Sequence, residues 1–208
     1  MTFEQRKNIR LPRHQYAGRR IYFVTICCEG RRRIFSDGAM ASAAVEVLKC
    51  VSAATVFLMH AYCVMPEHVH LLVEGRAEES DLTVLVGKLK QKIGYLWRRN
   101  KKRGGLESAP TCDRTSDPTQ SAQALWQRGY YDHVLRRTED SDGVAWYIWM
   151  NPVRQGLVNE PGQYAYSGSC TVEWPKSRRR AEEWIPPWKR LDGTRGKMER
   201  VGEIARAD

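Results

Sequence analysis

No stretch of the sequence is long and apolar enough to cross a membrane, because Glu46, Lys49 and His60 interrupt its longest hydrophobic region. The six cysteines form no Cys-x-x-Cys pair and no spacing typical of a disulfide framework, so we expect reduced thiols in a cytoplasmic protein. The N-terminus is charged and lacks the apolar segment of a signal peptide. These absences argue against a membrane protein and against a disulfide-rich secreted domain.

Acidic residues are scarce relative to basic ones. The chain has 24 Asp and Glu against 34 Lys and Arg, which gives a net charge of +10. This balance favours a polyanionic partner, nucleic acid first and an anionic membrane surface second. With 208 residues, 42% of them hydrophobic, the chain suits one domain with extensions, or at most two small domains. We expect a nucleic-acid partner, no membrane, and a monomer rather than a dimer.

The order of the predicted strands and helices indicates an α+β fold. Apolar, β-branched and aromatic runs predict strands at residues 21–28, 55–65, 68–74 and 125–136. Apolar residues three and four apart predict helices at 37–52 and 82–99, and candidate caps at 138–142 open another helix. This order is the split βαββαβ, ferredoxin-like plan, with one antiparallel sheet backed by two helices and an added C-terminal helix.

Two histidines, His68 and His70, flank Val69 at the start of the third predicted strand. Side chains alternate along a strand, so both imidazoles share one face, about 6.6 Å apart. We expect that face, opposite the two helices, to be exposed. Two imidazoles can hold a divalent metal ion if a third ligand arrives from elsewhere. The alternative is that the two histidines bind nothing, as on most exposed strand faces.

The added helix carries Tyr147, and Asn151 follows four residues later, so the two should share a helix face. The Asn151 carbonyl oxygen is a third ligand of the kind that suits Mg²⁺ or Mn²⁺. Each residue also has an ordinary alternative. Tyr147 could be a packing residue like its neighbour Trp146, and Asn151 could cap a following turn that starts at Pro152.

Basic residues gather in two places. Residues 1–20 form a basic arm, and the helix predicted at 82–99 carries lysines on its polar faces. Both could grip a nucleic-acid backbone, although a solvated tail and a solvated helix face are the alternatives. The candidate DNA-binding residues in these two segments are Arg10, Arg13, His14, Arg19, Arg20, Lys88, Lys90 and Lys92.

Three motifs occur together in a characteristic order. They are Val64–His70, Leu125–Gln127 with Tyr131–His133, and Tyr147–Ile148 with Asn151–Val153 and Gly156–Val158. In this order they resemble the REP-associated tyrosine transposases, a domesticated branch of the single-tyrosine HUH transposases. The likeness spans roughly residues 10–170 and is specific as a combination, although each motif is weak alone. The segments 101–122 and 171–208 look like departures from the compact family plan.

The resemblance implies a catalytic role for Tyr147 and metal binding by His68, His70 and Asn151. The implied substrate is single-stranded DNA with palindromic hairpins, the repetitive extragenic palindromes. The implied reaction is metal-dependent nicking and strand transfer through a 5′-phosphotyrosine, with Mg²⁺ or Mn²⁺ as cofactor. We also assign DNA contacts to Trp126 and His133, within the second motif. The rival function is a non-catalytic single-stranded nucleic-acid-binding protein on the same sheet.

The domain division follows from these patterns. We predict a basic N-terminal arm at 1–20, an HUH-type catalytic domain at 21–158 and an irregular basic extension at 159–208. Within the catalytic domain, residues 101–122 are rich in Gly, Pro, Ser and charge, which predicts a flexible insertion.

Other tyrosines compete with Tyr147 for the role of nucleophile. Tyr130 and Tyr131 are neighbours in the predicted fourth strand, so they point to opposite faces and at most one can reach the histidines. Tyr62 lies in the strand before the histidine motif, and its facing depends on a register that the sequence leaves open.

Overall fold

The computed structural model describes residues 16–104, 124–172 and 185. Its helices and strands follow in this order: β1 (Ile21–Cys27), α1 (Gly38–Ala53), β2 (Phe57–Met65), β3 (His68–Gly75), α2 (Leu82–Gly104), β4 (Tyr131–Val134), α3 (Ser141–Trp149), α4 (Asn151–Arg154) and β5 (Ser167–Gly168). Short 3₁₀ turns, η2 (Glu29–Arg31), η3 (Ile34–Ser36) and η4 (Pro161–Gln163), connect these elements.

The strands form one five-stranded antiparallel sheet in the order β4-β1-β3-β2-β5. β3 lies at its centre and pairs with β1 on one side and with β2 on the other. The β2–β3 hairpin turns through Pro66 and Glu67, so that Met65 pairs with His68. The predicted mixed α and β fold with an antiparallel sheet is confirmed, and the short edge strand β5 is an addition that the sequence did not predict.

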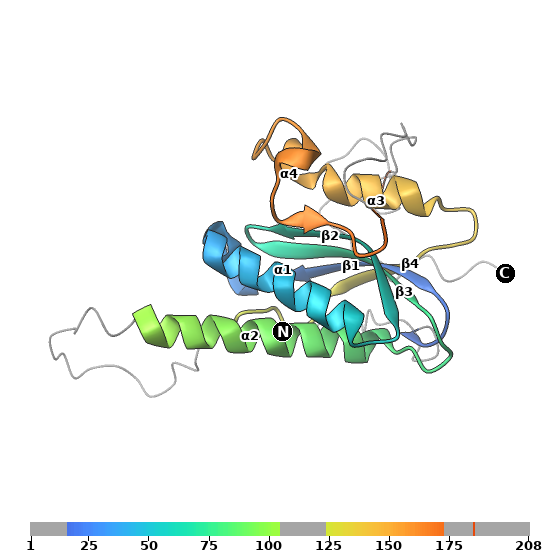
Figure 1. The fold of residues 1–208 in the computed structure, drawn as a ribbon, viewed down its shortest axis with the longest axis horizontal. Coiled ribbons are helices and arrows are strands. Elements are labelled where there is room, and N and C mark those ends of the chain that lie inside the picture. Colours follow the sequence, from blue (N-terminus) through green and yellow to red (C-terminus); the bar gives the residue numbers. More distant parts are fainter. Residues whose placement is uncertain (1–15, 105–123, 173–184, 186–208) are drawn as a thin grey trace, which may run out of the picture.

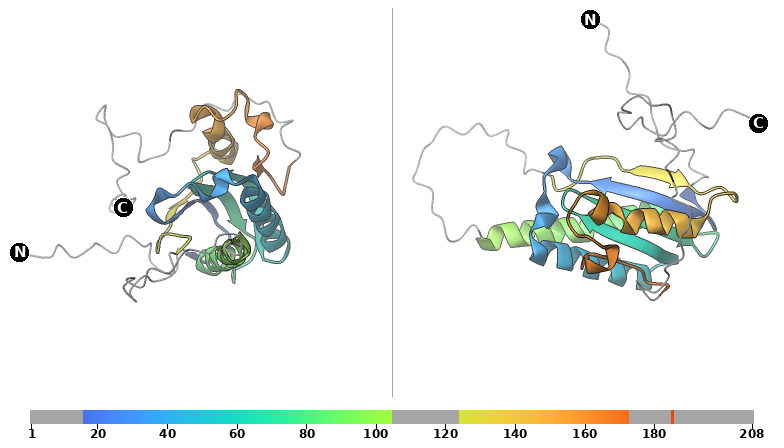
Figure 2. Two further views of the ribbon diagram at one scale, coloured as in Figure 1. Left: turned by 90° about the vertical axis from the view of Figure 1, so that its left-hand side faces the viewer. Right: turned by 90° about the horizontal axis from the view of Figure 1, so that it is seen from above.

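Helices cover both faces of the sheet (Figure 1). Tyr22, Val24 and Ile26 of β1 point into a large core with α1 and α2. Phe23, between them, points the other way and packs in a second core with residues of α3. Seen from above, α3 runs along the sheet over the β2–β3 hairpin (Figure 2), and it contacts both strands.

The second face is therefore not the exposed surface that the sequence predicted. His68 is only 6% exposed and His70 only 5% exposed. The reason is that α3 buries Val144 and Ile148 against the sheet, and the histidines lie in the same layer. An exposed strand face and a face covered by one later helix have the same alternating pattern, so the pattern alone does not distinguish them.

Two boundaries differ from the prediction in ways that matter for the site. The fourth strand covers only Tyr131–Val134, because Leu125 and Trp126 pack into the larger core instead of extending it. The helix α2 reaches Gly104, so the predicted insertion begins as helix. Residues 105–123, most of that insertion, lie outside the described residues, as do residues 1–15 of the arm and nearly all of the chain after 172.

Two expectations from composition agree with the described part of the chain. Among the helices of the described residues, none is long and apolar enough to cross a membrane. The cysteines there are all free thiols, at Cys27, Cys28, Cys50, Cys63 and Cys170.

Candidate active site

The strand register aligns the candidate residues in rows across the face that α3 covers. His70 pairs with Thr25 of β1 and with Cys63 of β2, and Thr25 in turn pairs with Tyr131 of β4. In the next row, His68 lies between Cys27 and Met65. Paired residues in adjacent strands project to the same side of a sheet, so the two histidines, Thr25 and Tyr131 share one face.

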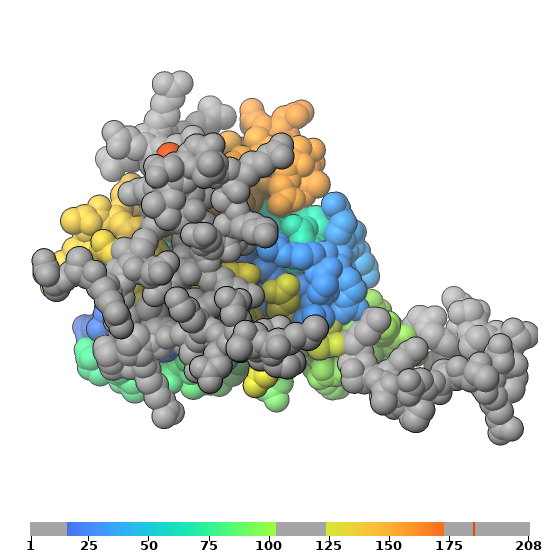
Figure 3. Space-filling model, turned by 180° about the vertical axis from the view of Figure 1, so that it is seen from behind, coloured from blue at the N-terminus to red at the C-terminus, as the bar shows by residue number. Residues whose placement is uncertain are grey.

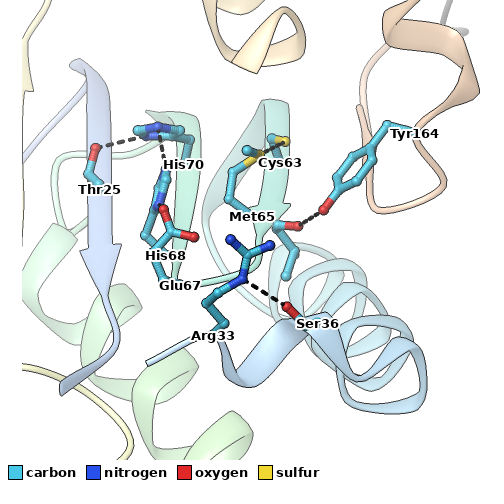
Figure 4. Close-up of polar contacts among 10 residues, drawn as sticks. Thr25, Arg33, Ser36, Cys63, Met65, Glu67, His68, His70 and Tyr164 are labelled. Carbon is cyan, nitrogen blue, oxygen red and sulfur yellow. Dashed lines mark hydrogen bonds and ion pairs between the residues drawn. The ribbon is translucent and has the colours of Figure 1, made fainter. Parts of the chain in front are cut away.

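The two imidazoles face each other. The His68 Nε2 and His70 Nε2 atoms are 2.9 Å apart, and the rings lie nearly edge to face. Each histidine is held at its other nitrogen, as Figure 4 shows. His68 Nδ1 lies 3.0 Å from Glu67 Oε1, and His70 Nδ1 lies 2.8 Å from Thr25 Oγ1. Both rings are thus oriented with Nε2 towards one common point.

This arrangement fits a divalent metal ion. Two imidazole nitrogens that bind one ion at about 2.1 Å and at a right angle are about 3 Å apart, close to the separation seen here. Histidine ligands characteristically donate their second nitrogen to a carboxylate or another oxygen, as Glu67 and Thr25 provide. No cluster of three His, Cys, Asp or Glu side chains suited to a metal occurs within the described residues, so an ion held by the two histidines would need further ligands of another kind.

With both rings neutral, the hydrogen-bond chain is consistent with one set of tautomers. A carboxylate accepts only, so Glu67 receives the Nδ1–H of His68, and the His68 Nε2 is left as an acceptor. The His70 Nε2–H must then donate to it, and His70 Nδ1 accepts from the Thr25 hydroxyl. The hydrogen bond from His68 holds the pKa of the Glu67 carboxyl below its usual value, although partial burial opposes this.

The Thr25 hydroxyl can form a hydrogen bond with either tautomer of His70. If both Nε2 atoms bind an ion, His70 must carry its proton on Nδ1 and donate it to Thr25. A hydroxyl can rotate from donor to acceptor without moving its oxygen. Thr25, itself buried, therefore supports the histidine pair both with and without an ion.

Tyr147 of α3 lies in the same layer as the histidines. Its ring packs edge-on against Phe23, with 6.1 Å between centroids, and Phe23 in turn stacks on His70 at 5.4 Å. The guanidinium of Arg154 lies over the Tyr147 ring, 4.2 Å from its centroid. The ring of Phe23 thus contacts both the predicted nucleophile, Tyr147, and His70 of the histidine pair.

Asn151 has a different place from the one that the sequence predicted. α3 ends at Trp149, and Asn151 opens the separate short helix α4 rather than continuing the helix of Tyr147. Pro152 explains the break, because it has no N–H to continue the helix. Asn151 does not cap α4 either: its amide nitrogen donates to the carbonyls of Tyr147 and Ile148 at 3.0 and 3.1 Å.

These two bonds fix the orientation of the Asn151 amide. Both partners are acceptors, so the group that faces them is the NH₂, and the side-chain oxygen points away from the end of α3. Its service as a metal ligand remains a prediction.

The register separates the rival tyrosines. Tyr62 is buried in the core with α1 and α2, and Tyr130 packs against that same core. Tyr131 is half-buried and, by its pairing with Thr25, lies on the face of the histidines. Tyr131 is therefore the one of these three that shares a face with the candidate site.

Three of the predicted DNA contacts make hydrogen bonds within the protein, and their contact with DNA stays a prediction. Trp126 is 9% exposed, and its indole N–H donates to the Lys90 carbonyl. The Lys90 ammonium bonds three consecutive carbonyls, at residues 127–129, which uses its three donors. His133 is held by both oxygens of the Glu139 carboxylate.

The other predicted DNA contacts fall into two groups. Lys88, Lys92, Arg19 and Arg20 are exposed, and Arg19 makes a long surface ion pair with Glu78. α2, which carries both lysines, lies on the opposite side of the sheet from α3 (Figure 1). Arg10, Arg13 and His14 lie outside the described residues.

Sequence reasoning missed several residues of the site. Glu67 could have been found, because it precedes His68 directly and glutamate is a common partner of ligating histidines. Thr25 becomes visible only when β1 is paired with β3.

The surface above the β2–β3 turn brings separate segments together. The loop after β1 is tied to that turn, since Cys28 N–H donates to the Glu67 carbonyl and Phe35 N–H to the Pro66 carbonyl. In the space-filling view, α4 (orange) lies next to this loop (blue) (Figure 3). Arginines of both segments, Arg33 and Arg154, are exposed there.

Comparison with known proteins places the chain in a family. The family model described as "Transposase IS200 like" matches residues 18–149, which include β1, both histidines and Tyr147. The chain belongs to the IS200-like transposase family. The matched range ends at the last residue of α3, so Asn151 and Arg154 lie just outside it.

Individual relatives refine this membership. A putative REP-associated tyrosine transposase of Haemophilus influenzae is 24% identical over 109 residues, which are 51% of this chain and 56% of the relative. A REP-associated tyrosine transposase of Escherichia coli K12 is 24% identical over 111 residues, 53% of each chain. An uncharacterized protein of H. influenzae is 26% identical over 168 residues, 71% of this chain and 88% of that protein. The chain thus spans little more than half the length of the two named relatives.

A solved structure shares the fold. It is described as a REP-associated tyrosine transposase bound to a REP hairpin, and it is 20% identical with a TM-score of 0.52. The likeness covers 80% of this chain and 82% of that one. The resemblance to REP-associated tyrosine transposases within the IS200-like family is confirmed.

Proposed function

We propose that this member of the IS200-like transposase family is a metal-dependent enzyme that nicks and rejoins single-stranded DNA at palindromic hairpins. The observation that carries the proposal is the pair of facing Nε2 atoms, 2.9 Å apart, in the same layer as Tyr147. A relative of the same fold is described as bound to a REP hairpin, which supports hairpin DNA as the substrate.

The proposed reaction is a transesterification. The Tyr147 hydroxyl oxygen attacks the scissile phosphorus and loses its proton to water, while the bond from phosphorus to the 3′-oxygen breaks. That oxygen takes up a proton as a free 3′-hydroxyl, and the 5′-phosphate stays on Tyr147. Attack by another 3′-hydroxyl reverses the step and releases the tyrosine, so joining needs no ATP.

His68 and His70 would hold Mg²⁺ or Mn²⁺, with the Asn151 oxygen as a further ligand. Such an ion supplies Lewis-acid polarisation of the phosphate. The protein side chains supply the rest: Glu67 and Thr25 orient the imidazoles, and Phe23 separates His70 from the nucleophile. The deciding test is whether the protein forms a denaturation-resistant adduct with hairpin DNA.

The rival function is binding of single-stranded nucleic acid without catalysis. The excess of basic residues supports it equally well. Its stacking platform is weakened in this structure, because Trp126 is buried and α3 covers the central face of the sheet. A protein that binds the hairpin but forms no adduct under any metal condition would favour this rival.

Deletion of residues 1–15 is expected to weaken hairpin binding about tenfold or more, because the arm carries basic residues that can neutralise phosphates. The deletion should stop there, since Tyr16 is buried and the Gly18 N–H donates to the Ser80 carbonyl. Fluorescence anisotropy with a hairpin and a scrambled strand of equal length measures the effect. A larger loss on the hairpin supports base reading by Arg10, Arg13 and His14, and equal losses reduce the arm to a nonspecific contact.

Replacement of Thr25 by Val is expected to weaken Mn²⁺ binding about 10–100-fold. Val keeps the shape of the side chain but removes the oxygen that accepts from His70 when the ion is bound. Isothermal titration of the DNA-free protein with Mn²⁺ measures this affinity. Thr25→Ser keeps the hydroxyl and serves as the matched control. If the Val and Ser variants bind Mn²⁺ equally well, Thr25 does not orient the ligand.

A further inference from the structure

The side chain of Arg154 contacts Tyr147 at two points. The guanidinium of Arg154 lies 4.2 Å from the centroid of the Tyr147 ring, and its terminal nitrogen donates to the main-chain carbonyl of the same residue. Arg154 is the last residue of α4, whereas Tyr147 lies in α3. These contacts therefore connect the two helices across the break between them. A planar cation is attracted to the face of a phenol ring, and this contact restricts how the ring can turn.

The position of Arg154 is itself fixed by the chain. Its main-chain N–H donates to the Met150 carbonyl. The side-chain amide of Asn151 donates hydrogen bonds to the carbonyls of Tyr147 and Ile148. The Tyr147 carbonyl thus accepts from both Asn151 and Arg154. Carbonyls at the C-terminal end of a helix carry partial negative charge, which favours a cation at this place.

The charge of Arg154 also reaches the histidine face. Burial raises the pKa of the Cys63 thiol, and Arg154 acts in the opposite direction on that group. Cys63 is the β2 neighbour of His70 in the sheet. The charge of Arg154, a residue that contacts the Tyr147 ring, thus acts on a residue in the same row of the sheet as His70.

We propose that Arg154 is the positioning residue of the nucleophile: it holds the Tyr147 ring in the orientation from which the hydroxyl attacks. This inference rests on the proposed function. Attack on phosphorus needs the reacting atoms aligned at about 3 Å, and misplacement by about 1 Å can cost 100-fold in rate.

Kinetics on the full-length protein test the proposal. Arg154→Met keeps an unbranched apolar stem but loses the planar cation, so adduct formation at saturating hairpin should slow about 10–100-fold. The affinity for the hairpin should change by less than about threefold. Arg154→Lys should restore little, because a lysine keeps the charge without the planar stack. Arg76→Met removes an exposed arginine just after the end of β3 remote from His68, and it should react like the wild type.

Three kinetic outcomes overturn the proposal. One is a wild-type rate in the Met variant. Another is a loss that appears only as weaker hairpin binding, which would make Arg154 a DNA contact. The third is full rescue by Lys, which would show that charge alone acts there.

A measurement without DNA separates this proposal from the proposed function. 3-Fluorotyrosine is placed at residue 147 alone, and its ¹⁹F resonance is recorded in the free protein. Arg154→Met should move the resonance towards that of the unfolded chain and narrow it, whereas Arg76→Met should leave it in place. An unchanged resonance in the Met variant contradicts the proposal that Arg154 positions the Tyr147 ring. If the wild type never forms an adduct, the proposed function fails, and this resonance still decides whether Arg154 holds the ring.

Discussion

Tyr147→Phe is expected to bind the hairpin with nearly wild-type affinity and to form no covalent adduct with it. The substitution removes one oxygen atom and keeps the ring, so the contacts with Phe23 and Arg154 remain. Because the contacts of the ring are kept, we expect the free energy of unfolding to change by less than about 1 kcal/mol. The loss should therefore lie in chemistry alone, which identifies the nucleophile.

The measurement uses end-labelled single-stranded DNA from the region around the gene, with Mn²⁺, and a denaturing gel. Tyr131→Phe is the matched control, because Tyr131 lies on the histidine face and is the nearest rival by register. It should form the adduct at a rate close to the wild type. A wild-type adduct whose peptide mass maps to Tyr131 would falsify the assignment and move the nucleophile to β4.

Local patterns were enough to predict the parts of the site that lie on one element. Alternation along a strand placed His68 and His70 on one face, and their Nε2 atoms do face each other. The acidic cap predicted at 138–142 is also present, since Asp140 accepts from the N–H groups of Asp142 and Gly143. In both cases the spacing along a single strand or helix decides which groups meet.

The parts that join distant elements could not be predicted in this way. Thr25 and His70 are 45 residues apart, and only the pairing of β1 with β3 brings them together. The contacts of Arg154 with Tyr147 depend on where α3 ends. The sequence predicted a continuous helix from Tyr147 to Asn151 and therefore did not predict this break. Trp126 illustrates a different limit, since an aromatic residue in a motif has the same sequence pattern whether it stacks on a base or fills a core.

The histidine pair carries the other large effect. His68→Gln combined with His70→Gln is expected to abolish Mn²⁺ binding and to slow adduct formation by about 1,000-fold or more, since Lewis-acid assistance contributes several kcal/mol. Gln is preferred to Ala here because both rings are buried, and truncating a buried ring leaves a cavity that costs about 2–4 kcal/mol. A double Ala variant would fold almost normally only if the two rings lay on the exposed face that the sequence alone predicted.

His60→Gln provides the matched control for this experiment. His60 lies on β2, bonded to Glu74 and Thr171, and it is not part of the facing pair. It should bind Mn²⁺ and form the adduct like the wild type. Isothermal titration with Mn²⁺ and the denaturing gel are run on the same preparations, and a urea titration confirms that each variant is folded. A folded double variant that still cuts at the wild-type rate with Mn²⁺ would place the metal elsewhere. The two facing Nε2 atoms are the groups of the pair that could bind an ion, and the double variant removes both.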